Sequence, residues 1–169
     1  MDTEKEEIHT LSILVDNEPG VLSRVAGLFS ARGFNIESLC VAATMDDKVS
    51  RITLVTRGNN QIQEQINKQL NKLINIIKVI DYEGTEFVER EMALVKAKTS
   101  GGHQAEILRI VDIFRCKVVD VTHHEITIEV TGARGKIEAL LDLIRPFGIA
   151  EIARTGSIAL ARSKKGKLS

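Results

Sequence analysis

Two periodicities alternate along the first half of the chain. Residues 8–16 place Leu11, Ile13 and Val15 on one face of an extended segment, which is typical of a half-buried strand. After a turn signal at 17–20, apolar residues recur at helical spacing, and Gly33 stands where a helix C-cap glycine is expected. The same reasoning predicts, in order, strand 8–16, a helix from 21, strand 34–45, strand 49–57, a helix over 62–73 and strand 76–82.

The second half of the chain repeats this order. Ile126, Ile128 and Val130 alternate with threonine and glutamate, as in a strand with one buried face. Breaks at 100–102 and at Gly132 separate strands from helices. The predicted elements are strand 87–98, a helix over 107–114, strand 117–121, strand 126–131, a helix over 137–144 that Pro146 ends, and one final strand over 149–161.

Each half is therefore predicted to be a βαββαβ unit of the α+β class. This is the ferredoxin-like arrangement, in which two helices cover one face of a four-stranded antiparallel sheet. We expect a first domain over residues 8–83, a second over 86–162, and flexible tails at 1–7 and 163–169. Since the second face of such a sheet must be solvated or covered by something else, the pattern also predicts an oligomer.

Composition narrows the choice of function. The 23 basic residues balance the 23 acidic ones, and 43% of the residues are hydrophobic, as in a soluble globular protein. No stretch approaches the ~20 apolar residues of a membrane helix and no signal peptide opens the chain, so a cytoplasmic protein without membrane contact is expected. Zero net charge, no tryptophan and a single tyrosine disfavour nucleic-acid binding, including an RNA-binding sheet, which needs stacking aromatic residues.

The segment from Asn17 to Leu22 is the most informative part of the sequence. It joins a predicted strand to a helix start, where free backbone N–H groups and the helix dipole favour an anion. Gly20 lets a ligand approach the backbone closely, and the Asn17 side chain offers a donor and an acceptor beside it. A carboxylate could bind here while Asn17 accepts from an ammonium group; the alternative is an ordinary strand-to-helix turn.

Longer motifs carry a resemblance to a known family. Residues 11–25 (LSILVDNEPGVLSRV) resemble the opening of an ACT domain, an amino-acid-binding regulatory module. From about residue 9 to 162, the chain resembles the small, regulatory subunit of acetohydroxyacid synthase, also called acetolactate synthase. The further segments that carry this resemblance are 27–39 (GLFSARGFNIESL), 50–55, 65–73, 88–96 (VEREMALVK), 113–115, 119–122 and 151–156 (EIARTG).

This resemblance implies a protein of branched-chain amino-acid biosynthesis that has no catalytic residues of its own. Members of the family bind the large, thiamine-diphosphate-dependent catalytic subunit, raise its activity and confer feedback inhibition, usually by valine. The chain itself is expected to hold no cofactor, whereas the catalytic partner is expected to use thiamine diphosphate, Mg²⁺ and FAD. A homodimer through the ACT domains is implied as well. The alternative is a stand-alone ACT protein that regulates a different enzyme.

The effector site that the resemblance implies lies between two ACT domains. Asn35 and Ile36 match the segment supplied across the interface, and an asparagine there suits an ammonium group, which needs acceptors. The aliphatic side chain of the effector is expected to rest near Leu22 and Ile36. One methylene changes binding by only ~1–3 kcal/mol, so valine, leucine and isoleucine are expected to bind with graded affinities. The family's carboxylate-binding loop corresponds to Asn17, Gly20, Val21 and Leu22.

The remaining motifs predict no chemistry. His123 and His124 are adjacent, so a strand would point them to opposite faces, and no metal site is expected. Residues 132–136 lack the spacing of a phosphate-binding loop. Cys40 and Cys116 form no CxxC pair, so neither a disulfide framework nor a zinc site is predicted.

Overall fold

The chain forms two compact units that do not follow one another along the sequence. In this computed structural model, which describes residues 7–163, the first unit contains residues 7–88 together with 157–163. The second unit contains residues 89–156 and is therefore an insertion in the first. The parts of the predicted flexible tails that lie outside the described residues are 1–6 and 164–169.

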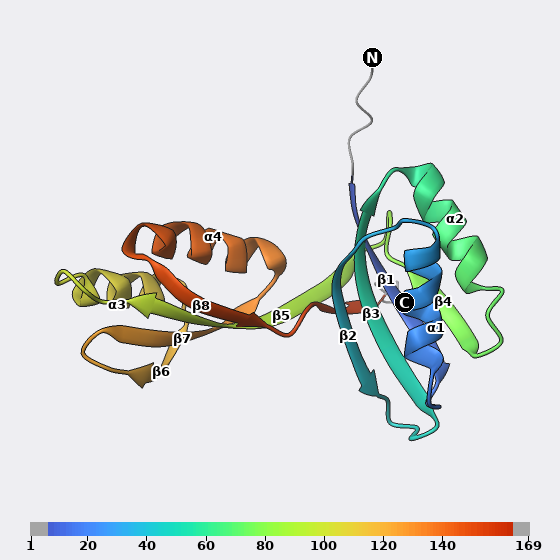
Figure 1. Ribbon diagram of the computed structural model, residues 1–169, viewed down its shortest axis with the longest axis horizontal. Coiled ribbons are helices and arrows are strands. Elements are labelled where there is room, and N and C mark those ends of the chain that lie inside the picture. Colours follow the sequence, from blue (N-terminus) through green and yellow to red (C-terminus); the bar gives the residue numbers. More distant parts are fainter. Residues whose placement is uncertain (1–6, 164–169) are drawn as a thin grey trace, which may run out of the picture. The chain divides into compact units, whose positions relative to one another are not determined.

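The first unit has the predicted βαββαβ order. Its sheet is antiparallel, with the strand order β2-β3-β1-β4 (Figure 1). A turn at residues 46–48 joins β2 to β3, as the sequence predicts. The N–H of Val49 closes it by donating to the carbonyl of Asp46 at 2.9 Å. The elements are β1 (Glu7–Asp16), α1 (Val21–Ala31), β2 (Ile36–Ala43), β3 (Val49–Gly58), α2 (Asn60–Leu70) and β4 (Ile76–Asp81).

One face of this sheet is buried under both helices. In the β1–β3 register Leu11 lies opposite Leu54 and Ile13 opposite Ile52, so these side chains share a face. Figure 1 shows α1 and α2 on the same side of the sheet. Burial of each large apolar side chain stabilises the fold by about 1.5–3 kcal/mol. The helix residues that complete this core are Val21, Val25, Phe29, Ile66 and Leu70.

The opposite face of this sheet is covered in part by the returning end of the chain. Ser12 and Thr53 lie opposite each other on that face, and they are 0% and 1% exposed. Strand β9 (Ile158–Ala161), which follows the second unit in sequence, contacts β1 and pairs with β5. The hydroxyl of Tyr82 donates to the carbonyl of Ala159 at 3.0 Å, and both residues are buried. The first unit therefore depends on residues 157–162.

The end of the chain differs from its predicted structure. The sequence predicts one strand over 149–161, but the strand is interrupted after β8 (Ile149–Arg154), where Gly156 adopts a φ of 81°. The contacts assign 157–162 to the first unit, whereas the sequence-based boundary placed 86–162 in the second domain. Hydrophobic alternation could not show this, because it reports which face of a strand is buried and not which sheet the strand joins.

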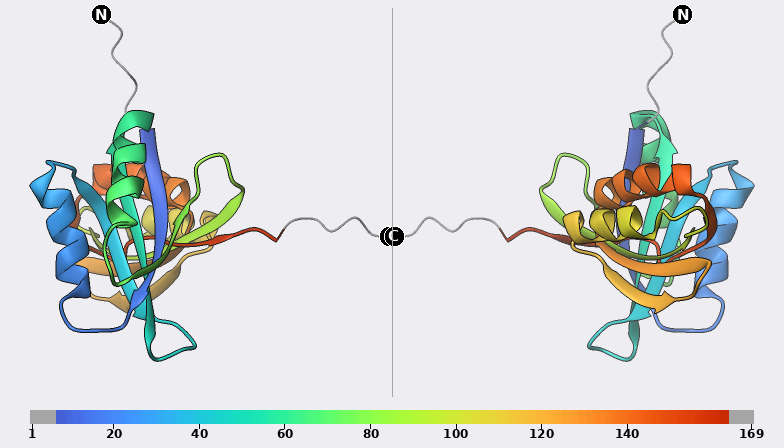
Figure 2. Two further views of the ribbon diagram at one scale, coloured as in Figure 1. Left: turned by 90° about the vertical axis from the view of Figure 1, so that its right-hand side faces the viewer. Right: turned by 90° about the vertical axis from the view of Figure 1, so that its left-hand side faces the viewer.

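The second unit is also ferredoxin-like, with the strand order β6-β7-β5-β8. Figures 1 and 2 show both of its helices on one side of its strands. Ala93, Val95 and Ala97 of β5 pack with Ile126, Ile128 and Val130 of β7 under these helices. The elements are β5 (Phe87–Lys98), α3 (Gln104–Ile113), β6 (Lys117–Val121), β7 (Glu125–Gly132), α4 (Arg134–Ile144), a 3₁₀ turn (Arg145–Phe147) and β8.

Removal of the returning segment is expected to destabilise the first unit. A chain that ends at Gly156 loses the pairing of β9 with β5 and, in addition, three hydrogen bonds that Tyr82, Ser38 and Glu86 make with residues 157–162. At about 1 kcal/mol each, this loss lowers the free energy of unfolding by about 2–4 kcal/mol. The chain contains one tyrosine and no tryptophan, so urea unfolding followed by tyrosine fluorescence reports on Tyr82.

A chain that ends at Ser163 is the control for this truncation, and it is expected to unfold like the full chain. Identical urea midpoints for the chains that end at residues 156 and 163 would contradict the assignment of the returning segment to the first unit.

Candidate functional site

The turn between β1 and α1 is held in place by the β2–β3 hairpin loop. The backbone N–H of Asn17 donates to the carbonyl of Lys48 at 2.8 Å. Its side-chain amide donates to the carbonyl of Asp47, also at 2.8 Å. Asn17 is exposed, and its side-chain oxygen accepts no hydrogen bond from the described residues. The side chain that the sequence singled out is therefore positioned by the hairpin loop and keeps an acceptor for a ligand.

Gly20 provides the N-cap of α1 in a left-handed conformation. Its φ is 87° and its ψ is −10°, and no side chain of the described residues caps the start of α1. At α2, by contrast, the Asn59 side chain accepts a hydrogen bond from the N–H of Ile62 at 3.0 Å. A Cβ on Gly20 would meet no atom of the described chain within 4 Å, so backbone conformation and not crowding favours glycine here. The N-terminus of α1 thus offers N–H groups to an anion.

Charged groups of both signs surround this turn. The guanidinium of Arg24 donates to the side-chain oxygen of Asn75. The amide of Asn75 in turn donates to the carboxylates of Asp16 and Glu18, at 3.3 and 3.4 Å. Asn75 therefore links one cation and two anions at the exposed end of the sheet. A zwitterionic ligand suits such a place, because each of its charged groups finds a partner of opposite sign.

Val21 and Leu22 contribute different parts to the site. The Val21 side chain is 3% exposed and belongs to the core, so only its backbone faces the turn, and its N–H donates to the carbonyl of Glu18 over a long 3.4 Å. The Leu22 side chain is 41% exposed. Of the two, only Leu22 presents apolar surface to a ligand.

Asn35 and Ile36 lie at the other end of the sheet. The carbonyl of Asn35 accepts from the hydroxyl of Thr56 at 2.7 Å, and Thr56 pairs with His9. His9 is seven residues before Asp16 along β1, which separates the two groups of predicted site residues by about 23 Å at the rise of a strand. The Asn35 side chain is exposed and donates to Glu37 at 3.5 Å.

One chain therefore does not bring the six predicted site residues together. The predicted carboxylate-binding loop, formed by Asn17, Gly20, Val21 and Leu22, stands at one end of the sheet, and Asn35 with Ile36 stands at the other. The Ile36 side chain is half-buried against the core under the helices, so only part of its surface is open to a ligand. A single amino acid that contacts both groups requires two chains.

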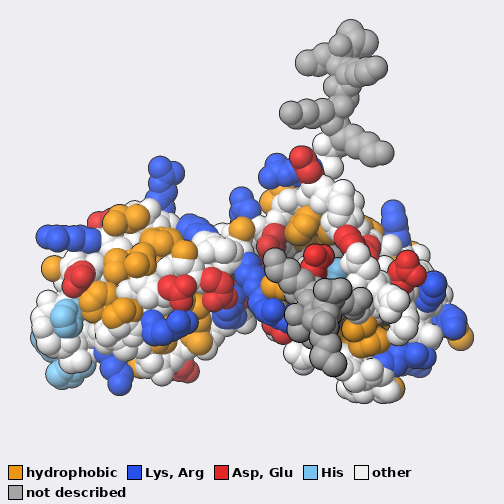
Figure 3. All heavy atoms as spheres, turned by 90° about the horizontal axis from the view of Figure 1, so that it is seen from above, with side chains coloured by type: hydrophobic (Ala, Val, Ile, Leu, Met, Phe, Trp, Pro, Cys, Tyr) orange, Lys and Arg blue, Asp and Glu red, His pale blue; other side chains and the backbone are white. Residues whose placement is uncertain are grey.

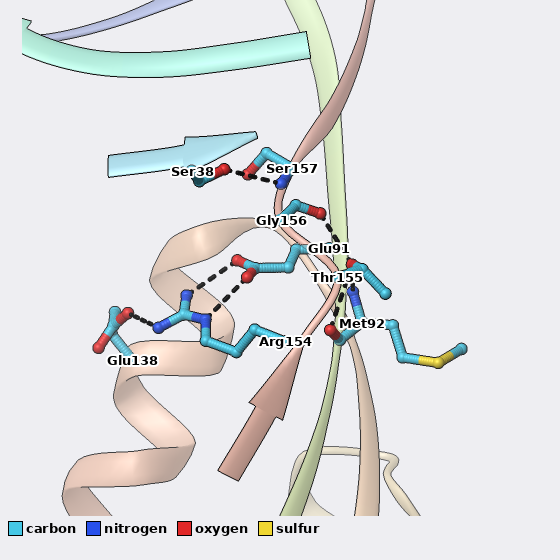
Figure 4. Close-up of polar contacts among 8 residues, drawn as sticks. All are labelled: Ser38, Glu91, Met92, Glu138, Arg154, Thr155, Gly156 and Ser157. Carbon is cyan, nitrogen blue, oxygen red and sulfur yellow. Dashed lines mark hydrogen bonds and ion pairs between the residues drawn. The ribbon is translucent and has the colours of Figure 1, made fainter. Parts of the chain in front are cut away.

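The sequence reasoning missed a charged cluster in the second unit. Arg154 on β8 makes two hydrogen bonds to the carboxylate of Glu91 on β5, at 2.7 and 2.8 Å, and a third to Glu138 on α4 at 2.8 Å (Figure 4). Glu91 is 5% exposed. These bonds, those to Glu91 above all, raise the pKa of Arg154. No local signal could reveal the pair, because Glu91 and Arg154 are 63 positions apart.

Histidine side chains gather at one end of the second unit (Figure 3). His123 and His124 lie in the β6–β7 loop, where their carbonyls accept hydrogen bonds from Thr99. With Gly101 and Gly102 they line an open depression of about 760 Å³. Residues 7–163 contain no group of three or more metal-ligating side chains. Burial raises the pKa of the Cys116 thiol, which disfavours the reactive thiolate.

The helices of residues 7–163 are all too short or too polar to cross a membrane.

Comparisons with protein families match both halves of the chain. A family described as "AHAS small subunit-like ACT domain" matches residues 11–78. A second family, described as "Small subunit of acetolactate synthase", matches residues 90–163. The first match covers the turn and the edge strand of the candidate site, and the second covers the cluster around Arg154.

Individual proteins match over nearly the whole length. The acetolactate synthase small subunit of Mycobacterium bovis is 50% identical over 158 residues, which cover 94% of each chain. That of Mycolicibacterium smegmatis is 49% identical and covers 94% of this chain and 93% of its own. The crystal structure of the acetolactate synthase small subunit from Thermotoga maritima superposes with a TM-score of 0.83 at 42% identity, covering 94% of this chain and 99% of that one.

Proposed function

Since the chain belongs to the family of acetolactate synthase small subunits, we propose that it is the regulatory subunit of that enzyme in branched-chain amino-acid biosynthesis. It binds the catalytic large subunit, raises its activity and makes it sensitive to valine. The observation that carries this proposal is 50% identity over 94% of both chains to a small subunit. The catalytic subunit then carries out the reaction, and this chain binds it with a free energy that depends on the effector.

The proposed effector site is built from two copies of the chain. The α1 N-terminus around Gly20 receives the carboxylate of valine, and the side-chain oxygens of Asn17 and of Asn35 from the second copy receive its ammonium group. Support comes from the missing side-chain cap of α1 and from the exposure of both asparagines. The dipole at the start of a helix adds about 0.3–1 kcal/mol for an anion, and more where the ion is partly buried.

Strand β2 supplies the proposed dimer interface. It is an edge strand, because the sheet order leaves it paired on one side only, with β3. Antiparallel pairing of β2 with β2 of a second copy would set Ile36 beside Ala43 of that copy. Ala43 leads into the hairpin loop that holds Asn17. Such pairing therefore carries Asn35 from one end of its own sheet to the Asn17 turn of the partner.

Inhibition then follows from linkage. Valine binds one arrangement of the paired ACT domains more tightly than another, and so shifts the population that the catalytic subunit meets. A coupling free energy of about 1–3 kcal/mol changes affinities by about 5–150-fold. Leucine and isoleucine differ from valine by one methylene, so they act at higher concentrations.

The whole proposal is tested by reconstitution. The purified chain with pyruvate and thiamine diphosphate is expected to form no acetolactate. Added to the catalytic subunit, it is expected to raise the turnover, and valine is then expected to lower it. Acetolactate formation by the chain alone, or an unchanged turnover of the catalytic subunit in its presence, would refute the proposal.

Asn17→Ala is expected to weaken valine inhibition about tenfold or more, because a hydrogen bond to a charged group contributes about 1.5–3 kcal/mol. Activation of the catalytic subunit should stay close to that of the wild type. Equal losses of activation and inhibition would mean that Asn17 serves the fold.

A mixed dimer tests whether the site is shared. When one chain carries Asn17→Ala and the other Asn35→Ala, a shared arrangement leaves one intact site and one doubly altered site. Calorimetry of the purified heterodimer should then show one valine bound with wild-type affinity. If the site lay within a single chain, no intact site would remain and this binding would be lost.

Gly20→Asp is expected to abolish valine inhibition, because a carboxylate at the N-terminus of α1 repels that of the ligand. Gly20→Asn is the matched control, because asparagine has the same shape as aspartate and tolerates a positive φ equally well but carries no charge. Valine inhibition should survive in Gly20→Asn with a modest loss. Equal inhibition of both variants would exclude the anion-binding role of this turn.

A further inference from the structure

The chain passes between the two units twice. It leaves the first unit after Val88 and returns at Ser157. A domain joined by a single linker can rotate freely about it, but an inserted domain is held by two covalent connections. The residues beside these two crossings therefore determine how a change in the first unit reaches the second.

On the side of the second unit, the two crossings are fastened to each other (Figure 4). The buried Glu91 and Arg154 form the bidentate ion pair described above, three residues after one crossing and three before the other. Next to them, the N–H of Thr155 donates to the carbonyl of Met92 at 3.0 Å, and the Thr155 hydroxyl accepts from the N–H of Met92 at 3.1 Å. Both strands therefore move together at this end of the second unit.

On the side of the first unit, the returning chain is held by strand β2. The N–H of Ser157 donates to the hydroxyl oxygen of Ser38 at 3.3 Å, and Ser157 is 2% exposed (Figure 4). Between the two attachments lies Gly156 alone, with a φ of 81°. A displacement of Ser157 is therefore transmitted to Thr155 through a single residue.

Ser38 lies where the effector is proposed to act. It follows Asn35 and Ile36 at the start of β2, directly after a shift in the β2–β3 register between Ile36 and Ser38. At such an irregularity the regular hydrogen bonds to the neighbouring strand are locally interrupted, and the next side chain points in a different direction. The start of β2 can therefore shift when Asn35 engages a ligand, and Ser38 shifts with it.

From these contacts we infer that Ser38 is a positioning residue that conveys effector binding to the second unit, through Ser157 and Gly156 to the strands fastened by Thr155 and Arg154. The inference rests on the proposed regulatory function for its ligand, but the connection itself is a property of the full chain. Ser38 acts through the returning strand, to which the hydrogen bond from Ser157 joins it.

Hydrogen exchange of the full chain tests the connection without any effector. Ser38→Ala is expected to speed exchange of the Ser157 amide and, in the second unit, of the Met92 and Thr155 amides by about 3–10-fold. Ser38→Thr keeps the hydroxyl and should exchange like the wild type, as should Ser30→Ala on the exposed face of α1. Faster exchange confined to Ser157 in Ser38→Ala, with Met92 and Thr155 unchanged, would overturn the inference.

The holoenzyme tests the consequence. Ser38→Ala should bind valine within about threefold of the wild type and activate the catalytic subunit normally, yet require at least fivefold more valine for inhibition. Thr155→Val changes the same connection on the side of the second unit, at an exposed position. It should likewise bind valine normally but need more valine for inhibition. Normal inhibition in both variants, or equal losses of binding and inhibition, would overturn the inference. A wild type indifferent to valine would refute the proposed function instead, and hydrogen exchange would then decide the connection.

Discussion

Each sheet of this protein has two faces but only one pair of helices to cover them, and the architecture follows from this constraint. In the second unit the free face carries charged residues such as Lys96 and Glu151, which pair at 3.1 Å and tolerate water. In the first unit the corresponding face includes Ser12, Thr53 and Val55, all almost fully buried. That face depends on a cover, and the returning chain supplies part of it. The second unit lies between Val88 and Ser157 in the sequence, so this covering segment comes after it.

The same constraint bears on the effector site. The first sheet has helices over one face and the returning chain over part of the other, which leaves its edges for new partners, and β2 is the edge strand beside the two groups of candidate site residues. These groups stand at opposite ends of β2, so antiparallel pairing of two copies is the simple arrangement that joins them. The proposed dimer interface, the proposed effector site and the returning strand thus all meet at β2. This explains how a small ligand on one edge could influence a domain that follows later in the sequence.

The Glu91–Arg154 pair shows why such a connection can be stiff. Taking a carboxylate out of water is unfavourable unless it is fully bonded, and Glu91 obtains two bonds from a single guanidinium. Loss of Arg154 leaves the Glu91 carboxylate buried and unpaired, at a cost of about 3–5 kcal/mol. The planar, bidentate geometry also fixes the direction of both strands, which a single hydrogen bond would not do. Gly156, which follows two residues later, is by contrast the one position between the two attachments where the backbone is permissive.

The sequence by itself determined the two βαββαβ units, the faces of their strands and the turn around Gly20, because period-2 and period-3.6 patterns and turn residues are local properties. The match to longer motifs indicated the family, which the comparisons confirmed. Only the tertiary structure decided that residues 157–162 rejoin the first unit, that Asn17 and Asn35 lie at opposite ends of one sheet, and that Glu91 meets Arg154. Each of these depends on which strands pair with one another, and alternation along a strand carries no information about its partner.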